Sequence, residues 1–181
     1  MSLPETNVPF IFMNAASSVR DLITMVHESG HAVHSFLSAD LPLREYKDYP
    51  SEIAEVASMS MELFTMEHWQ LFFENEADYK RAKEQQFQRI ITIFPWVAII
   101  DRYQQWIYTN PGHTREQRLD AWKEIFGSFS SEEVDYSGLE ESVKYRWHAQ
   151  IHLFDYPFYY IEYAIAQLGA IAMWKQWKEK G

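Results

Sequence analysis

The stretch TMVHESGHAVHSF, residues 24–36, constrains the fold most, because it lies inside a long apolar repeat of helical spacing. Apolar or small side chains recur there at steps of three and four, which is the pattern of one helix face. These positions are Val19, Leu22, Ile23, Val26, Gly30, Val33 and Leu37. Ser18 and Asp21 have the spacing of a capping box in front of the run. The sequence therefore predicts a helix over about residues 18–38.

Five further stretches have the periodicity or the boundary signals of helices. They cover about residues 51–74, 77–109, 114–127, 130–153 and 157–178, and the signals at four of their starts are Ser51, Thr114, Ser130 and Pro157. Pro95 should kink or break the second of them, because proline removes a backbone donor and clashes with the preceding turn. Residues 8–13, VPFIFM, resemble a strand that has no evident partner nearby. We expect an all-α fold, mainly helical, with at most one short N-terminal strand.

Composition and charge exclude several classes of function. The chain has 181 residues, a net charge of −10 and no strongly basic stretch, so we expect no nucleic-acid partner. It has no cysteine, so any metal must be held by His, Asp or Glu. No apolar run has the length of a membrane span, and the opening MSLPETNVPF lacks the regions of a secretory signal. We therefore expect a cytoplasmic protein that does not bind a membrane.

The HESGH segment has the spacing of half a zinc site. His27 and His31 are four residues apart, so on a helix their side chains leave the same face, about one turn from each other. Glu28 between them points about 100° away from His27, which suits a general base better than a third ligand. The alternative is a partly exposed pair of histidines that merely flanks an apolar stripe.

A third protein ligand is needed, because catalytic zinc takes three and keeps one open position. His34 is close in sequence, but a straight helix would have to stretch to bring it to the same ion. The better candidates are carboxylates on the predicted helix that follows, at Glu52, Glu55 and Glu62. Small residues near Glu55 would let that helix approach the histidine helix. Glu52 and Glu62 remain candidates for orienting the ligand histidines.

HESGHAVHS followed by AEVASMSME resembles the oligoendopeptidase F and thimet oligopeptidase family of zinc endopeptidases, and PFIFMN upstream is similar to the segment before the family's zinc helix. The resemblance implies that His27, His31 and Glu55 bind Zn²⁺, with Glu55 standing 24 residues after His31. It also implies that Glu28 is the general base. Because family members are much longer, we expect residues 1–181 to be a single helical catalytic domain, a fragment of a longer metallopeptidase.

The segment HLFDYPFYYIEYA, residues 152–164, is similar to the family's C-terminal His-and-Tyr motif. The resemblance assigns His152, Tyr156 and Tyr163 to substrate binding and oxyanion stabilisation, and Tyr160 to a nearby substrate contact. The choice between Tyr159 and Tyr160 stays open. On a helix Tyr156, Tyr160 and Tyr163 could share one face. Taken alone, this segment would be interpreted as an aromatic core stripe.

These assignments predict a zinc-dependent endopeptidase that cleaves internal bonds of short peptides with a metal-activated water and Glu28 as the base. One alternative is a non-catalytic helical zinc-binding or interaction module. Another is a di-iron carboxylate protein, because Glu28 and His31 form an E-x-x-H pair, although that architecture needs a second such pair on another helix. The amphipathic C-terminal segment AMWKQWKEK could support a homo-oligomer.

Overall fold

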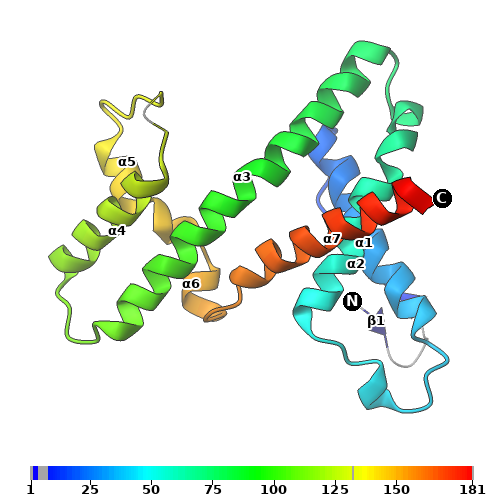
Figure 1. The fold of residues 1–181 in the computed structure, drawn as a ribbon, viewed down its shortest axis with the longest axis horizontal. Coiled ribbons are helices and arrows are strands. Elements are labelled where there is room, and N and C mark those ends of the chain that lie inside the picture. The colour runs from blue at the N-terminus through cyan, green and yellow to red at the C-terminus, as the bar shows by residue number, and fades with distance from the viewer. Residues whose placement is uncertain (1, 4–7, 132, 181) are drawn as a thin grey trace. The chain divides into compact units, whose positions relative to one another are not determined.

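The computed structural model describes residues 2–3, 8–131 and 133–180, which are mainly helical, as predicted (Figure 1). The α-helices are α1 (Val19–Leu37), α2 (Ser51–Thr65), α3 (Glu76–Thr109), α4 (Arg115–Phe129), α5 (Glu140–Tyr145), α6 (His152–Asp155) and α7 (Ile161–Lys180). Short 3₁₀ helices cover Arg44–Tyr46, Met66–Phe72 and Arg146–Ala149. Within the described part of the chain, no helix is long and apolar enough to cross a membrane.

The N-terminal strand is shorter than predicted and has a partner. β2 (Val8–Pro9) pairs antiparallel with β1 (Ser2–Leu3), so that Leu3 lies opposite Val8. The expectation of a strand over residues 8–13 without a nearby partner was therefore wrong. Pro9 has no backbone N–H to donate, which suits the end of a strand and not its centre. Residues 10–16 have no regular secondary structure.

Two helix starts follow their predicted capping signals. At α1, Asp21 Oδ2 accepts hydrogen bonds from the backbone N–H groups of Ser18 at 2.7 Å and Ala16 at 2.8 Å. At α4, Thr114 and Gln117 form a reciprocal pair, because each backbone N–H donates to the other residue's side-chain oxygen. These contacts satisfy N–H groups that have no acceptor within the first turn of a helix.

Other boundaries differ from the prediction. The second predicted helix ends at Thr65 and continues as a 3₁₀ helix, and its N-cap is Pro50 and not Ser51. The region predicted to be helical from residue 130 becomes an α-helix only at Glu140, and the last helix begins at Ile161, after the predicted start at Pro157. The predicted break at Pro95 does not occur, because α3 runs through it as one helix (Figure 1).

The described chain divides into two compact units, one formed by residues 1–90 and 165–181 and the other by residues 91–164. The prediction of a single catalytic domain stays a prediction. The first unit contains α1, α2, the beginning of α3 and most of α7. Its core includes the buried side chains of Leu63, Met66 and Trp69.

In the first unit, aromatic pairs join α7 to its neighbours. The ring centroids of Trp177 and of Phe64 on α2 lie 5.5 Å apart. Trp174 lies 6.3 Å from Phe87 on α3. Because aromatic pairs at these separations contribute beyond the area that they bury, these contacts stabilise the packing of α7 on α2 and on the start of α3.

The second unit has an aromatic core between α3, α4 and the 3₁₀ helix at Arg146–Ala149. Its buried members are Ile99, Ile100, Tyr103, Trp122, Ile125, Phe126 and Trp147. Trp122 is fully buried, and its indole N–H donates to the Val143 carbonyl at 2.7 Å, so this polar atom is satisfied. Burial also raises the pKa of Tyr103, which keeps its phenol neutral inside the core.

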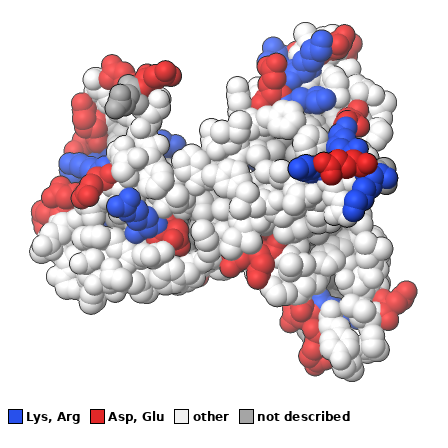
Figure 2. All heavy atoms as spheres, viewed as in Figure 1, with Lys and Arg blue, Asp and Glu red and all other residues white. Residues whose placement is uncertain are grey.

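Charged residues are mixed on the face of the molecule that Figure 2 shows. Lys and Arg side chains stand among Asp and Glu there and form no broad basic patch. Such mixing is typical of an ordinary solvated surface. The expected absence of a nucleic-acid partner stays a prediction.

Candidate functional site

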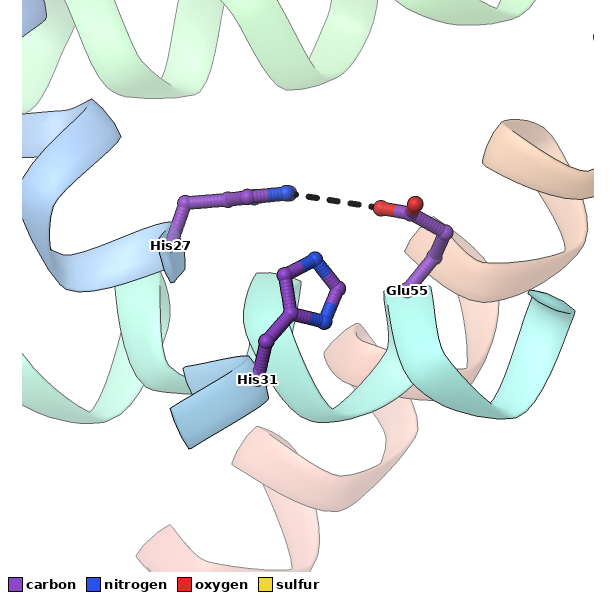
Figure 3. A group of neighbouring side chains, drawn as sticks. All are labelled: His27, His31 and Glu55. Atoms are coloured by element: carbon purple, nitrogen blue, oxygen red, sulfur yellow. Dashed lines mark ion pairs between the residues drawn. The ribbon is translucent and has the colours of Figure 1, made fainter. Parts of the chain in front are cut away.

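Three side chains converge between α1 and α2 in the first unit (Figure 3). His27 and His31 come from successive turns of α1, with their rings edge to face at 5.1 Å between centroids. Glu55 comes from α2, and each of the three residues offers a ligand atom within 4.8 Å of the other two. Among the residues that the structure describes, no other group of three or more His, Asp or Glu could hold a metal ion.

Gly30 explains how α1 and α2 come close enough for this arrangement. A Cβ atom on Gly30 would lie 2.5 Å from Ser58 Cα and 2.9 Å from the Ala57 carbonyl oxygen, too close for real contacts. Gly30 is therefore required by the backbone of the facing helix and not by its own dihedral angles. The small residues Ala57 and Ser58 complete the contact, as the sequence predicted.

A hydrogen-bonded chain fixes the orientation of the His27 ring. His27 Nδ1 lies 2.6 Å from Glu62 Oε1. The Gln86 amide on α3 donates to Glu62 Oε2 at 2.6 Å, and both Glu62 and Gln86 are buried. Because Nδ1 is occupied in this way, His27 turns Nε2 toward Glu55 Oε2, 3.4 Å away. Of the two carboxylates that the sequence left open as orienting groups, Glu62 contacts His27.

Gln86 was missed by sequence analysis. It lies 24 residues after Glu62, in a helix rich in polar side chains, and nothing around it in the sequence distinguishes it from its exposed neighbour Gln85. Its burial depends on how α3 packs against α2, which is a tertiary property. Its other amide atom, Oε1, is also buried and has no hydrogen-bond partner among the described residues.

The electrostatics of the site favour a positive charge between the carboxylates. Burial lowers the pKa of His27, but its hydrogen bonds with the Glu55 and Glu62 carboxylates outweigh burial and raise the pKa to about 9. Burial raises the pKa of Glu55, and the His27 and His31 rings outweigh it, so this pKa lies below its ordinary value. Burial lowers the pKa of His31, which favours the neutral imidazole that a metal needs.

The donor set suits zinc. Two imidazole nitrogens and one carboxylate oxygen form a ligand set known from catalytic zinc sites, which keep a fourth position open. A histidine whose second ring nitrogen bonds to a carboxylate is the usual arrangement around such an ion, and His27 has this arrangement with Glu62. Figure 3 shows the rings and the carboxylate pointing toward a common region. His27, His31 and Glu55 therefore fit a zinc ion.

Glu28 and His34 occupy different positions around this group. Glu28 follows His27 on α1, is half-buried, and is close enough for its charge to raise the pKa of His31 against the effect of burial. The ring of His34 stacks on Tyr49 at 3.9 Å between centroids and does not belong to the metal-capable group. These positions agree with the interpretation of His34 as a neighbour of the site.

The second unit contains the predicted His-and-Tyr motif as a cluster of rings. His152 is surrounded by the rings of Tyr156, Tyr159, Tyr160 and Tyr163 at centroid distances of 6.0, 5.9, 4.9 and 5.6 Å. Tyr163 Oη lies 3.3 Å from His152 Nε2. Burial raises the pKa of Tyr160. The structure brings the motif together without deciding between Tyr159 and Tyr160 as a substrate contact.

The tyrosines do not share one helix face, so that expectation was wrong. α6 ends at Asp155 and α7 begins only at Ile161, because Phe158 adopts a left-handed backbone conformation with φ of 60°. This conformation is rare for a bulky residue and costs about 1 kcal/mol or more. The Phe158 N–H donates to the buried side chain of Gln104 at 2.9 Å, which stabilises the turn.

The fold and this arrangement of residues are typical of one class of protein. A His-Glu-x-x-His helix that meets a glutamate from a neighbouring helix is typical of zinc metallopeptidases. A model of peptidase family M3 matches residues 2–181 of the chain. The chain belongs to peptidase family M3.

Individual relatives support the assignment of the chain to this family. An oligoendopeptidase F homolog of Lactococcus lactis subsp. lactis is 26% identical over 174 residues, covering 88% of this chain and 26% of that protein. Oligopeptidase PepF of Bacillus subtilis is 40% identical over 60 residues, covering 33% of this chain and 9% of the relative. The chain thus spans about a quarter of the length of the first of these relatives.

A solved structure described as PZ peptidase A with inhibitor 2 is also similar. It matches with a TM-score of 0.81 and 31% sequence identity, over 96% of this chain and 30% of that one. The predicted resemblance to the oligoendopeptidase family is therefore confirmed.

Proposed function

We propose that this chain is the catalytic core of a zinc-dependent endopeptidase. The observation that carries the proposal is the convergence of His27, His31 and Glu55, with Glu28 beside them, in a chain of peptidase family M3. When bound there, Zn²⁺ would polarise a peptide carbonyl and make a water molecule more acidic. His27 would offer Nε2, since Glu62 engages its Nδ1.

Glu28 is the general base in this proposal. Its carboxylate accepts a proton from the attacking water and passes it to the leaving amine. Glu62 holds the His27 ring in the required tautomer, and Gln86 keeps the Glu62 carboxylate in place. The support for the orienting roles of Glu62 and Gln86 is the chain of short hydrogen bonds that ends at His27.

The substrates that we propose are short peptides cleaved at internal bonds, in keeping with the names of the relatives. Tyr163 and Tyr156 would donate hydrogen bonds to the oxyanion that forms on the substrate, and His152 and Tyr160 would bind the peptide. A cytoplasmic location belongs to the same proposal. Self-association stays a prediction that gel filtration would test.

Zinc content and cleavage of an internally quenched peptide test the proposal together. Glu28→Gln should keep zinc and reduce cleavage by about 10²–10⁴-fold, because it loses only the base. Glu55→Ala should lose both zinc and cleavage, because it loses a ligand. Glu52→Gln, on the same helix but outside the metal-capable group, is the matched control and should retain both.

Two results would overturn the proposal. If Glu28→Gln cleaved the peptide as fast as the parent chain, Glu28 would not be the base. If the parent chain bound zinc and cleaved no peptide, the non-catalytic zinc-binding module would replace the endopeptidase.

A further inference from the structure

A chain of three hydrogen bonds in the second unit ends at the Tyr163 hydroxyl. The indole N–H of Trp96 donates to Gln150 Oε1 at 3.1 Å. Gln150 Nε2 lies 2.6 Å from His152 Nδ1. His152 Nε2 lies 3.3 Å from Tyr163 Oη. The sequence segments that resemble the family contain neither Trp96 nor Gln150.

Elementary donor and acceptor rules give this chain one direction. An indole N–H can only donate, so the oxygen of the Gln150 amide must face Trp96. The amide nitrogen then faces His152 and can only donate, so Nδ1 of His152 must accept. A neutral imidazole with an accepting Nδ1 has its proton on Nε2. That proton is directed at the Tyr163 oxygen.

We propose that Gln150, held by Trp96, sets the tautomer of His152 and thereby directs the hydroxyl proton of Tyr163 away from the imidazole. Gln150 and Trp96 are then positioning residues, since they act through His152 and Tyr163. The Tyr163 oxygen accepts from His152, and the Tyr163 hydroxyl donates its own proton in the reaction. The catalytic meaning of this arrangement rests on the proposed peptidase function, whereas the tautomer itself does not.

The backbone and ring contacts of the two positioning residues keep them in place. The Gln150 N–H donates to the carbonyl of Trp147, a core residue, and the Gln150 carbonyl accepts from the N–H of Leu153. The Trp96 ring packs edge-on against Trp122 at 6.2 Å, with the Arg146 guanidinium over its face at 4.9 Å. The backbone of Gln150 and the ring of Trp96 are therefore held in place, and the Trp96 N–H in turn holds the oxygen of the Gln150 amide.

Trp96 also acts on a second tyrosine. Burial raises the pKa of Tyr160, and a hydrogen bond from the Trp96 side chain opposes that rise. This contact does not alter the direction of the chain, because the indole N–H is a donor to either oxygen. Because a Trp96 variant would also alter the surroundings of Tyr160, Gln150 is the better residue for a test.

The test is ¹⁵N NMR of the His152 ring in the full 181-residue chain, with the signals assigned by their loss in His152→Gln. The parent chain should show an unprotonated Nδ1 and a protonated Nε2. Gln150→Glu replaces the donating amide by a carboxylate that only accepts, so Nδ1 should become protonated. Gln85→Glu makes the same replacement at an exposed position of α3 and should leave both signals unchanged.

Two further variants keep the test decisive. Tyr163→Phe should leave Nδ1 unprotonated, because Gln150 and not Tyr163 sets the tautomer. Trp96→Phe keeps an aromatic ring without the N–H, so the amide can turn over and His152 should show both tautomers. A protonated Nδ1 in the parent chain, or an unchanged Nδ1 in folded Gln150→Glu, would overturn the proposal. If Gln150→Glu does not fold, the parent and Trp96→Phe spectra decide.

Cleavage kinetics supply the functional arm. Gln150→Glu should lower kcat by up to about 10²-fold with little change in KM, because an oxyanion donor is turned away from the substrate. In a Tyr163→Phe background the same change should have no further effect, since both act through one hydroxyl. A further loss of kcat in that background would show that Gln150 does not act through Tyr163. A parent chain without cleavage would contradict the proposed function and leave the tautomer result standing.

Discussion

The metal-capable group of the first unit and the His-and-Tyr cluster of the second are built in opposite ways. His27, His31 and Glu55 project from two regular helices, and their spacing follows from helical periodicity and the close contact at Gly30. The rings around His152 come together because the helix is interrupted and Phe158 takes a left-handed conformation. A site on regular helices can be predicted from residue spacing in the sequence. A site made by an interrupted helix depends on contacts between residues that are far apart in the chain.

The largest expected effect is at Gly30. Gly30→Ala places a Cβ against the backbone of α2, so we expect a loss of about 1–3 kcal/mol or more in the free energy of unfolding, as for other overpacked sites. Zinc binding should weaken with it, because α1 and α2 must move apart. Urea unfolding and metal titration measure the two effects.

Gly127 in α4 is the matched control. A Cβ there would meet nothing within 4 Å, so Gly127→Ala should stabilise the chain by about 0.5–1 kcal/mol through helix propensity. If both glycine variants had the same effect, close helix contact would not be the reason for Gly30.

The next largest effect is expected on zinc affinity when Gln86 is replaced. Gln86→Leu removes the donor to Glu62 Oε2 and should weaken zinc binding about 10–100-fold, as for other groups that orient metal ligands. Gln85→Leu, at the exposed neighbouring position, should leave the dissociation constant unchanged. Competition with a chelator of known affinity measures both variants. Equal affinities would mean that Glu62 keeps its place without Gln86.

Gln104 tests the interrupted helix of the second unit. Gln104→Leu removes the acceptor of the Phe158 N–H, which should cost about 1 kcal/mol of unfolding free energy and shift the His152 NMR signals. Gln105→Leu changes an exposed residue of the same helix and should stay within about 0.5 kcal/mol of the parent chain. Unshifted His152 signals in Gln104→Leu would show that this bond does not hold the turn.

The smallest effect is expected at the start of α1. Hydrogen bonds from the backbone of Ser18 and Ala16 hold the pKa of Asp21 below its ordinary value of 3.8. The stability that Asp21 contributes is therefore present above that value and lost as pH falls through the lower pKa of the folded state. Asp21→Ala should unfold more easily than the parent chain at neutral pH, and the difference should vanish in acid. A difference independent of pH would contradict this origin.

The sequence predicted the features that depend on local patterns. The span of α1, the caps at Ser18 and Thr114, and the approach of α2 through Ala57 and Ser58 all follow from periodicity, capping chemistry or side-chain size. The helical class of the fold follows in the same way. Each of these signals lies within a few residues of the feature that it predicts.

The features that sequence analysis missed depend on distant partners. Gln86 and Gln150 are ordinary glutamines in sequence, and only packing shows that one holds Glu62 and the other faces His152. The left-handed Phe158 was not predicted, because bulky residues rarely adopt that conformation and its partner Gln104 lies 54 residues away. Tertiary contacts decided these positions against local preference.

The contact at Gly30 has a mechanical consequence for the metal-capable group. At Gly30 the α1 backbone meets the α2 backbone at Ala57 and Ser58 directly, with no side chain of its own between them. This contact sets the spacing between the two helix backbones from which the imidazoles and the Glu55 carboxylate project. An ion much larger than the space among His27, His31 and Glu55 would have to push α1 and α2 apart at this contact.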